Sequence, residues 1–199
     1  MGTTGIIVLI VAIVAVLALV AFAVSQARRN RLRRTFGPEY DRLAAEHGDR
    51  RAAEHELAER ERDHRALELR PLDQPDQARF AAAWTAAQED FIEDPRTAVR
   101  EAEHIIDDLL TRLGYQGPDG SRQLALASVD HASGVAEYHE GHDLLQETRQ
   151  DTGPVADESA STEALRRAMQ HYGVFIEDLL GNSQPRQPAT KRLTTETKI

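Results

Sequence analysis

The sequence predicts an all-α protein, with an N-terminal transmembrane helix, a long charged helical stalk, a small bundle of about four helices and a disordered C-terminal tail. Three observations predict this class. An apolar run without charges, residues 5–24, lies near the start of the chain. Further on, apolar residues recur every three or four positions, which is the period of one helix face. No segment alternates with a period of two for long enough to form a strand.

The predicted anchor covers residues 5–24. At about 1.5 Å per residue, a helix of this length crosses the hydrocarbon core of about 30 Å. A cleaved signal peptide is the alternative, since Ala21-Phe22-Ala23 resembles a cleavage site. However, residues 1–4 carry no basic side chain, and the apolar run is longer than a usual signal peptide requires. We therefore expect residues 5–24 to lie in the lipid bilayer of the cell membrane as a single pass.

A basic juxtamembrane segment, residues 25–37, follows the anchor. Its five arginines are Arg28, Arg29, Arg31, Arg33 and Arg34. Basic residues beside a span stay on the cytoplasmic side, so we expect the N-terminus outside and the C-terminal domain in the cytoplasm. The same arginines can attract anionic head groups, although their role as a stop-transfer flank is sufficient to explain them.

Residues 38–70 are predicted to form one long charged helix, which begins at Pro38 and ends before Pro71. This segment holds ten acidic residues and seven arginines. Its leucines are few, and Gly48 interrupts the apolar stripe. We interpret the segment as a solvated stalk. A loose coiled coil, through which the chain self-associates, is the alternative.

Residues 73–181 are predicted to form an acidic helical bundle. One helix starts near Asp73 and the next starts at Asp94 and ends at Gly114. A third stretch runs from about residue 121 to 147, and the last helix ends at Gly181. Four helices with short connections predict an up-down bundle. A polar loop over residues 148–161 and a disordered tail over residues 182–199 complete the prediction.

Charge and composition exclude several classes of function. Residues 71–182 contain 22 acidic residues and eight arginines, within a chain of net charge −9. Such a domain repels nucleic acid, so no nucleic-acid partner is expected and a basic protein surface fits better. The absence of cysteine excludes disulfides, thiolate zinc sites and a cysteine nucleophile.

The eight histidines are the main chemical resource of the chain, yet they predict no metal or other cofactor. Glu101 and His104 match part of a di-iron motif, but they face away from the apolar side of their helix. His139 and His142 are one residue too close for a His-Glu-x-x-His zinc motif. No nucleophile elbow or phosphate-binding loop is present, so we predict no catalytic residues and no enzyme activity.

His131 and His142 are the candidate site residues. If residues 121–147 form one helix, both lie on its apolar face with Leu124, Val135 and Tyr138. They are then either structural histidines, neutral and hydrogen-bonded, or the centre of a pH-sensitive or ligand-binding core. The sequence leaves both interpretations open.

The order of several short motifs resembles an actinobacterial family of small membrane-anchored proteins. The resemblance covers about residues 5–181 and departs from the family pattern at Gln116, after Gly114-Tyr115, where proline is frequent. It implies anchoring and a shared helical domain; the family has no assigned activity, so no catalytic residues follow from it. The motifs are Phe36-Gly37-Pro38-Glu39-Tyr40-Asp41, Leu67-Glu68-Leu69-Arg70-Pro71-Leu72, Phe91-Ile92-Glu93-Asp94-Pro95, Gly114-Tyr115 and Ser128-Val129-Asp130-His131.

Together these observations predict a membrane-tethered, non-catalytic interaction or scaffold module that presents an acidic helical domain to a protein partner in the cytoplasm. One alternative is a ligand- or pH-sensing domain that uses the core histidines, with metal dependence less favoured. Another is a structural envelope protein that self-associates through the stalk.

Overall fold

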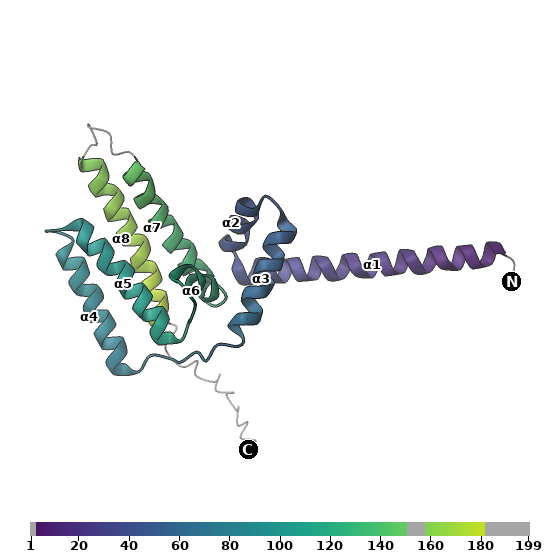
Figure 1. Cartoon of the computed structure of the whole chain (residues 1–199), viewed down its shortest axis with the longest axis horizontal. Helices are drawn as coiled ribbons and strands as arrows, with labels where there is room; N and C mark the ends of the chain where they lie inside the picture. Colours follow the sequence, from purple (N-terminus) through teal and green to yellow (C-terminus); the bar gives the residue numbers. More distant parts are fainter. Residues whose placement is uncertain (1–2, 151–157, 182–199) are drawn as a thin grey trace, which may run out of the picture.

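The computed structural model describes residues 3–150 and 158–181 (Figure 1). These residues form eight helices and no strand, which confirms the predicted all-α class. The predicted tail, residues 182–199, lies outside the described residues, as does the middle of the loop predicted over residues 148–161.

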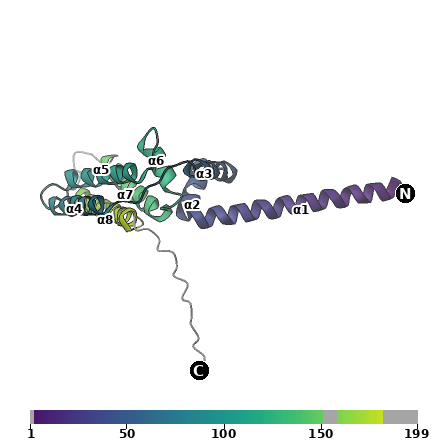
Figure 2. The ribbon, with the colours of Figure 1, turned by 90° about the horizontal axis from the view of Figure 1, so that it is seen from below.

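The first helix, α1 (Thr3–Phe36), extends away from the rest of the molecule (Figures 1 and 2). Its stretch Ala12–Phe36 is long and apolar enough to cross a membrane. Large apolar side chains along it are exposed, including Leu19 and Phe22 at 68%. The predicted anchor lies within this helix. The basic segment continues the same helix as far as Phe36, because arginine is a good helix former, and the helix stops only at Gly37.

The prediction of a single long helix over residues 38–70 is wrong. The segment forms two helices, α2 (Pro38–His47) and α3 (Arg50–His64), which fold back on one another as a hairpin. The chain reverses at Gly48, whose φ of 64° is in the left-handed region that glycine adopts without a steric penalty. Asp49 then caps α3 by accepting a hydrogen bond from the Arg51 N–H.

The hairpin is also not a solvated stalk. Its apolar residues pack with the C-terminal end of α1 in a small core of their own, so the stripe that a coiled coil would use is buried within the chain. This core contains Leu32, Phe36, Tyr40, Leu43, Ala53 and Leu57. No flexible linker therefore separates α1 from the hairpin.

The remaining helices form the larger body. Four of them, α4 (Gln74–Asp90), α5 (Pro95–Leu113), α7 (Ala132–Gln150) and α8 (Glu158–Gly181), pack around a second core. The predicted N-caps Asp73 and Asp94 and the predicted stop at Gly114 are confirmed. The single helix predicted over residues 121–147 is wrong, because the short helix α6 (Gly120–Ala127) is separate from α7.

The turn between α6 and α7 has a local cause. The Ser128 hydroxyl donates to the Ala125 carbonyl at 2.7 Å, and the N–H groups of Asp130 and His131 both bond back to the Ala127 carbonyl. Hydroxyl bonds of this kind compete with the helix, and Val129 and Asp130 have low helix propensity. The turn matters for function because the hairpin docks on it, as His64 Nε2 lies 2.7 Å from Asp130 Oδ2.

Candidate functional site

A cavity of about 580 Å³ lies between the hairpin and the larger helical body. Helices α2 and α3 supply one wall, and α5, α6 and α7 supply the other. We call this cavity the hairpin pocket. Its ionisable lining residues are Glu39, Arg42, Glu46, His47, Glu56, Arg60, Asp107, Tyr138, His139 and His142.

A buried ion cluster forms the hairpin wall. The exposed fractions of Glu39 and Arg60 are only 1% and 5%. Arg42 donates from Nε and Nη2 to the two oxygens of Glu39 at 2.9 and 3.0 Å, and Arg60 Nη1 donates to Glu39 Oε1 at 2.9 Å. Burial alone would raise the pKa of Glu39, but the hydrogen bond and charge of Arg42 and the hydrogen bond of Arg60 outweigh it and lower that pKa.

Arg60 connects this cluster to the rest of the molecule. It binds Glu56 on its own helix and donates from Nη1 to the Ser128 hydroxyl at 3.4 Å, in the turn between α6 and α7. Glu56 in turn lies 2.6 Å from His47 Nε2. A single guanidinium thus joins α2, α3 and the α6–α7 turn. A paired charge of this kind fixes geometry more than it adds stability.

Histidines form the opposite wall. His139 is half-buried, and burial is the main cause that lowers its pKa; Arg42 acts in the same direction, whereas Glu39 and Asp143 oppose it. Burial, together with the carboxylates of Glu103 and Asp107, raises the pKa of Tyr138 to about 12. At neutral pH, His139 and Tyr138 therefore present neutral hydrogen-bonding groups to the cavity.

His142 has an unsatisfied nitrogen. Its Nδ1 is buried without a hydrogen-bond partner, and the nearest recorded carboxylate oxygen, Glu103 Oε1, lies at 3.8 Å. Its Nε2 lies 3.1 Å from Gln146 Nε2, and its ring stacks on Tyr138 with the centroids 6.0 Å apart. If Gln146 donates to Nε2, Nδ1 carries the proton and is an unused donor.

The two candidate histidines do not form one site. His131 is 6% exposed and its Nδ1 lies 2.9 Å from Asp178 Oδ2, with Tyr115 packed edge-on at 6.0 Å. His142 is eleven positions further along the chain, about 16 Å along the axis of α7. Only His142 lines the hairpin pocket. The structure therefore gives His131 a structural environment and assigns the open position to His142.

The five arginines of the basic juxtamembrane segment, which we call the basic collar, fall into two groups in the structure. Arg31 forms an ion pair with Glu61 of α3, and Arg33 lies 3.3 Å from Asp41 and over the ring of Tyr40 at 5.1 Å. By contrast, three collar arginines have no ion-pair partner among the described residues. They are Arg28, Arg29 and Arg34.

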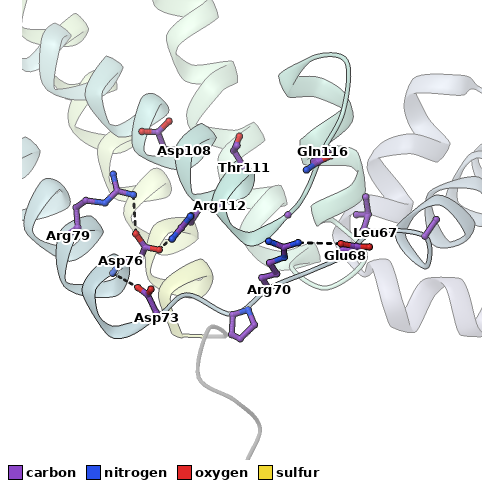
Figure 3. A pocket seen from close by; sticks show the side chains of 13 residues that line it. Leu67, Glu68, Arg70, Asp73, Asp76, Arg79, Asp108, Thr111, Arg112 and Gln116 are labelled. Atoms are coloured by element: carbon purple, nitrogen blue, oxygen red, sulfur yellow. Dashed lines mark hydrogen bonds and ion pairs between the residues drawn. The ribbon is translucent and has the colours of Figure 1, made fainter.

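A second cavity, of about 770 Å³, lies under the linker between α3 and α4 (Figure 3). Its arginines are already paired, Arg70 with Glu68 at 3.3 Å and both Arg79 and Arg112 with Asp76. The Arg70 N–H also bonds to the Leu113 carbonyl at 2.9 Å. These contacts hold the linker on α5, so we interpret this cavity as structural.

Sequence reasoning missed the ion cluster because it treated residues 38–70 as solvated, and it considered His139 only as part of an incomplete zinc motif. Tyr40 and Leu43 before Gly48, with Ala53 and Leu57 after it, are the signal that predicts a hairpin. Within residues 3–150 and 158–181, no group of three His, Asp or Glu side chains is arranged to hold a metal ion. No protein-family model, curated protein or solved structure matches the chain.

Proposed function

We propose that the chain is a membrane-tethered, non-catalytic interaction module, which presents its acidic helical body to a protein partner in the cytoplasm. The apolar helix α1 supports the tether, since its exposed apolar residues have no protein contacts to satisfy them. The packing of α1 against the hairpin supports a fixed presentation, because Leu32 and Phe36 are 2% and 0% exposed.

The connection between α4 and α5 is the observation that carries this proposal. It lies at the end of the molecule furthest from α1 in both views (Figures 1 and 2). Ile92 is 87% exposed there, among acidic side chains. We call this surface the distal corner; its residues are Glu89, Asp90, Ile92, Glu93 and Asp94.

The distal corner is unfavourable for the helix that ends there. Glu89 and Asp90 are at the C-terminal end of α4, which has no basic residue in its last turn. Acidic side chains at this end oppose the helix dipole, by about 0.3–1 kcal/mol each. An exposed apolar side chain ringed by carboxylates suits a basic partner with an apolar depression, in which Ile92 is desolvated and the charges set the orientation.

Photo-crosslinking in native membranes tests the proposal. A photoreactive amino acid replaces Ile92, and a control carries it at Val174, which is 51% exposed on α8. We expect a discrete cross-linked product from position 92 and none from position 174. Neutralising the corner by Glu89→Gln, Asp90→Asn and Glu93→Gln should remove the product. A product that survives neutralisation, or none above the control, would overturn the proposal.

The hairpin pocket supports a second function, ligand or pH sensing. The specific observation is the buried, unpartnered Nδ1 of His142, beside His139, whose pKa burial lowers. A bound ligand with a hydrogen-bond acceptor would satisfy that nitrogen. A His142→Leu variant discriminates the two functions, because it removes the nitrogen and should leave cross-linking at the distal corner unchanged.

A further inference from the structure

The outward face of α3 carries a basic surface, although the net charge of the hairpin is negative. Three residues of α3 and its C-cap residue, which together we call the basic face, recur at helical spacing. They are Arg51, His55, Arg62 and Arg65. All four are exposed, with side-chain exposures of 71% for His55, 60% for Arg62 and 68% for Arg65.

No acidic residue of α3 lies within the basic face, although the hairpin also exposes Asp41, Glu46, Asp49, Glu59 and Asp63 on its other surfaces. Glu39, Glu61 and Glu56 have side-chain exposures of 1%, 12% and 31%, and each is paired with an arginine. Glu59, 49% exposed, lies at the edge of the basic face and is only loosely paired with Arg62, at 3.7 Å. Surface pairs of this kind contribute little, so the arginines remain open to another anion.

The basic face lies on the side of α3 away from the larger body. The body contacts α3 through Arg60, Asp63 and His64, which bind Ser128, Arg122 and Asp130. Arg60 and His64 are on the helix face opposite Arg62 and Arg51, and Asp63 is at the side between them. In both views α3 lies between the larger body and the free length of α1 (Figures 1 and 2). The basic face is therefore turned away from the larger body, and α3 itself lies beside the end of α1 that leads to the predicted bilayer.

The distance to the bilayer is short. Arg31, which pairs with Glu61 of α3, is seven residues beyond the end of the predicted anchor at Val24. At 1.5 Å per residue this is about 10 Å beyond the hydrocarbon core. The head-group layer itself occupies about 5–8 Å on each side, and the Debye length at physiological salt is about 8 Å. The basic face thus lies within electrostatic reach of the lipid head groups.

We propose that the basic face of α3, with the unpaired Arg28, Arg29 and Arg34, is a bilayer-contact surface that binds the head groups of anionic lipids. This inference rests on the membrane tether of the proposed function and adds a second contact, which fixes the tilt of the whole domain. The surface divides the chain into a basic side against the membrane and an acidic side away from it. Neutralising one arginine near an anionic surface lowers binding about fivefold.

The test uses the full chain reconstituted into vesicles of phosphatidylcholine, with or without phosphatidylserine. Because the chain has no cysteine, a His55→Cys variant carries one fluorophore on the basic face, and Glu93→Cys carries it at the distal corner. A quencher is attached to the lipid head groups. We expect quenching at position 55 that depends on phosphatidylserine, and little quenching at position 93.

The variant R51Q/R62Q/R65Q should remove the phosphatidylserine-dependent quenching at position 55, since three neutralised arginines lower this contact about a hundredfold. A matched control, R96Q/R100Q/R166Q, removes the same number of charges from exposed arginines of the larger body. It should retain the phosphatidylserine-dependent quenching at position 55. Two outcomes would overturn the proposed lipid contact of the basic face and leave the membrane anchor supported. In both, the chain floats with the vesicles; either position 55 is not quenched, or its quenching does not depend on phosphatidylserine. If the chain does not float with the vesicles, the lipid contact and the anchor are both overturned.

Discussion

Two buried charges, Glu39 and Arg60, determine how the hairpin joins the rest of the molecule. Arg60 is shared between Glu39 on α2 and Ser128 beyond α6, which are 21 and 68 positions away in sequence. Removing one partner from such a cluster leaves a charge buried without compensation, which costs far more than the intact pair contributes. The cluster is therefore the most sensitive point of the hairpin.

A Glu39→Gln substitution should lower the free energy of unfolding by about 3 kcal/mol, because Arg42 and Arg60 lose their shared buried carboxylate and Arg60 keeps only the partly exposed Glu56. The control is Glu46→Gln, which removes the exposed carboxylate on the other side of Arg42 and should cost less than about 1 kcal/mol. Urea unfolding of the full chain in detergent, followed by circular dichroism, measures both. Equal losses for the two variants would contradict the buried cluster.

Glu39 also determines how the stability of the chain changes at acidic pH. Since the pKa of Glu39 is lowered in the folded chain, its contribution is present above the ordinary carboxyl pKa of about 4.3 and is lost as the pH falls through the folded pKa. The unmodified chain should lose stability below about pH 4, and the Glu39→Gln variant should lose less over that range.

His139 predicts a response nearer neutrality. Burial lowers its pKa, so the unfolded chain binds a proton near pH 6.5 that the folded chain excludes. The contribution of neutral His139 to the stability of the folded chain is therefore complete above about pH 6.5, and the chain loses stability as the pH falls towards the folded pKa. Melting temperatures between pH 7.5 and 5.0 should fall less for His139→Gln than for the unmodified chain. His104→Gln, at an exposed position on α5, should leave the slope unchanged.

At the scale of the elements, two glycines determine where helices end. Gly48 and Gly114 have φ values of 64° and 99°, and each ends its helix in the left-handed conformation. Gly114 has a second constraint: a Cβ at this position would lie 2.6 Å from the backbone oxygen of Glu68. The C-terminal end of α5 is therefore also the surface on which the linker from α3 rests.

A Gly114→Ala substitution should lower the free energy of unfolding by about 2 kcal/mol or more, because it combines a left-handed alanine with a backbone clash. It should also release the linker, which exposes the Arg70 N–H that bonds to Leu113. Gly181→Ala is the control, since nothing lies within 4 Å of a Cβ there. Thermal unfolding gives the energies, and faster hydrogen exchange at Arg70 reports the released linker. Unchanged exchange would contradict this account.

Some helix boundaries could be predicted from the sequence and others could not. Helix starts at Asp73 and Asp94 were predictable because a cap is local, set by bonds across three residues. The hairpin was missed because the apolar stripes of α2 and α3 are thin, so the signal of Tyr40, Leu43, Ala53 and Leu57 on either side of Gly48 is weak. The hairpin pocket could not be predicted either, because His139 comes close to Arg42 only when the hairpin packs against the larger body.

For the whole molecule, the joint between α1 and the hairpin matters most. Phe36 and Tyr40 are fully buried on either side of Gly37, so the direction of α1 is coupled to the hairpin. The hairpin in turn forms one wall of the pocket and carries the basic face. In the proposed arrangement, three contacts orient the domain on the membrane: the anchor, this joint and the face of α3.

The orientation across the membrane gives the last prediction. The collar arginines follow the apolar run and none precedes it, so the larger body should be cytoplasmic. A Glu93→Cys variant places one thiol in the exposed distal corner, and Thr4→Cys is the matched control before the anchor. A membrane-impermeant maleimide should label position 93 only after cell lysis, and position 4 in intact cells.

The opposite pattern would place the body outside the cell and would contradict the arginine argument. It would also remove the basis for a cytoplasmic partner, since the distal corner would then meet only extracellular proteins. The basic face would remain beside a bilayer, but beside the outer leaflet, so head-group binding would have to be tested with the anionic lipids of that leaflet. Labelling of both positions in intact cells would indicate mixed insertion. In that case the five arginines would be insufficient to set the direction, and additional basic residues within residues 25–37 should restore a single one.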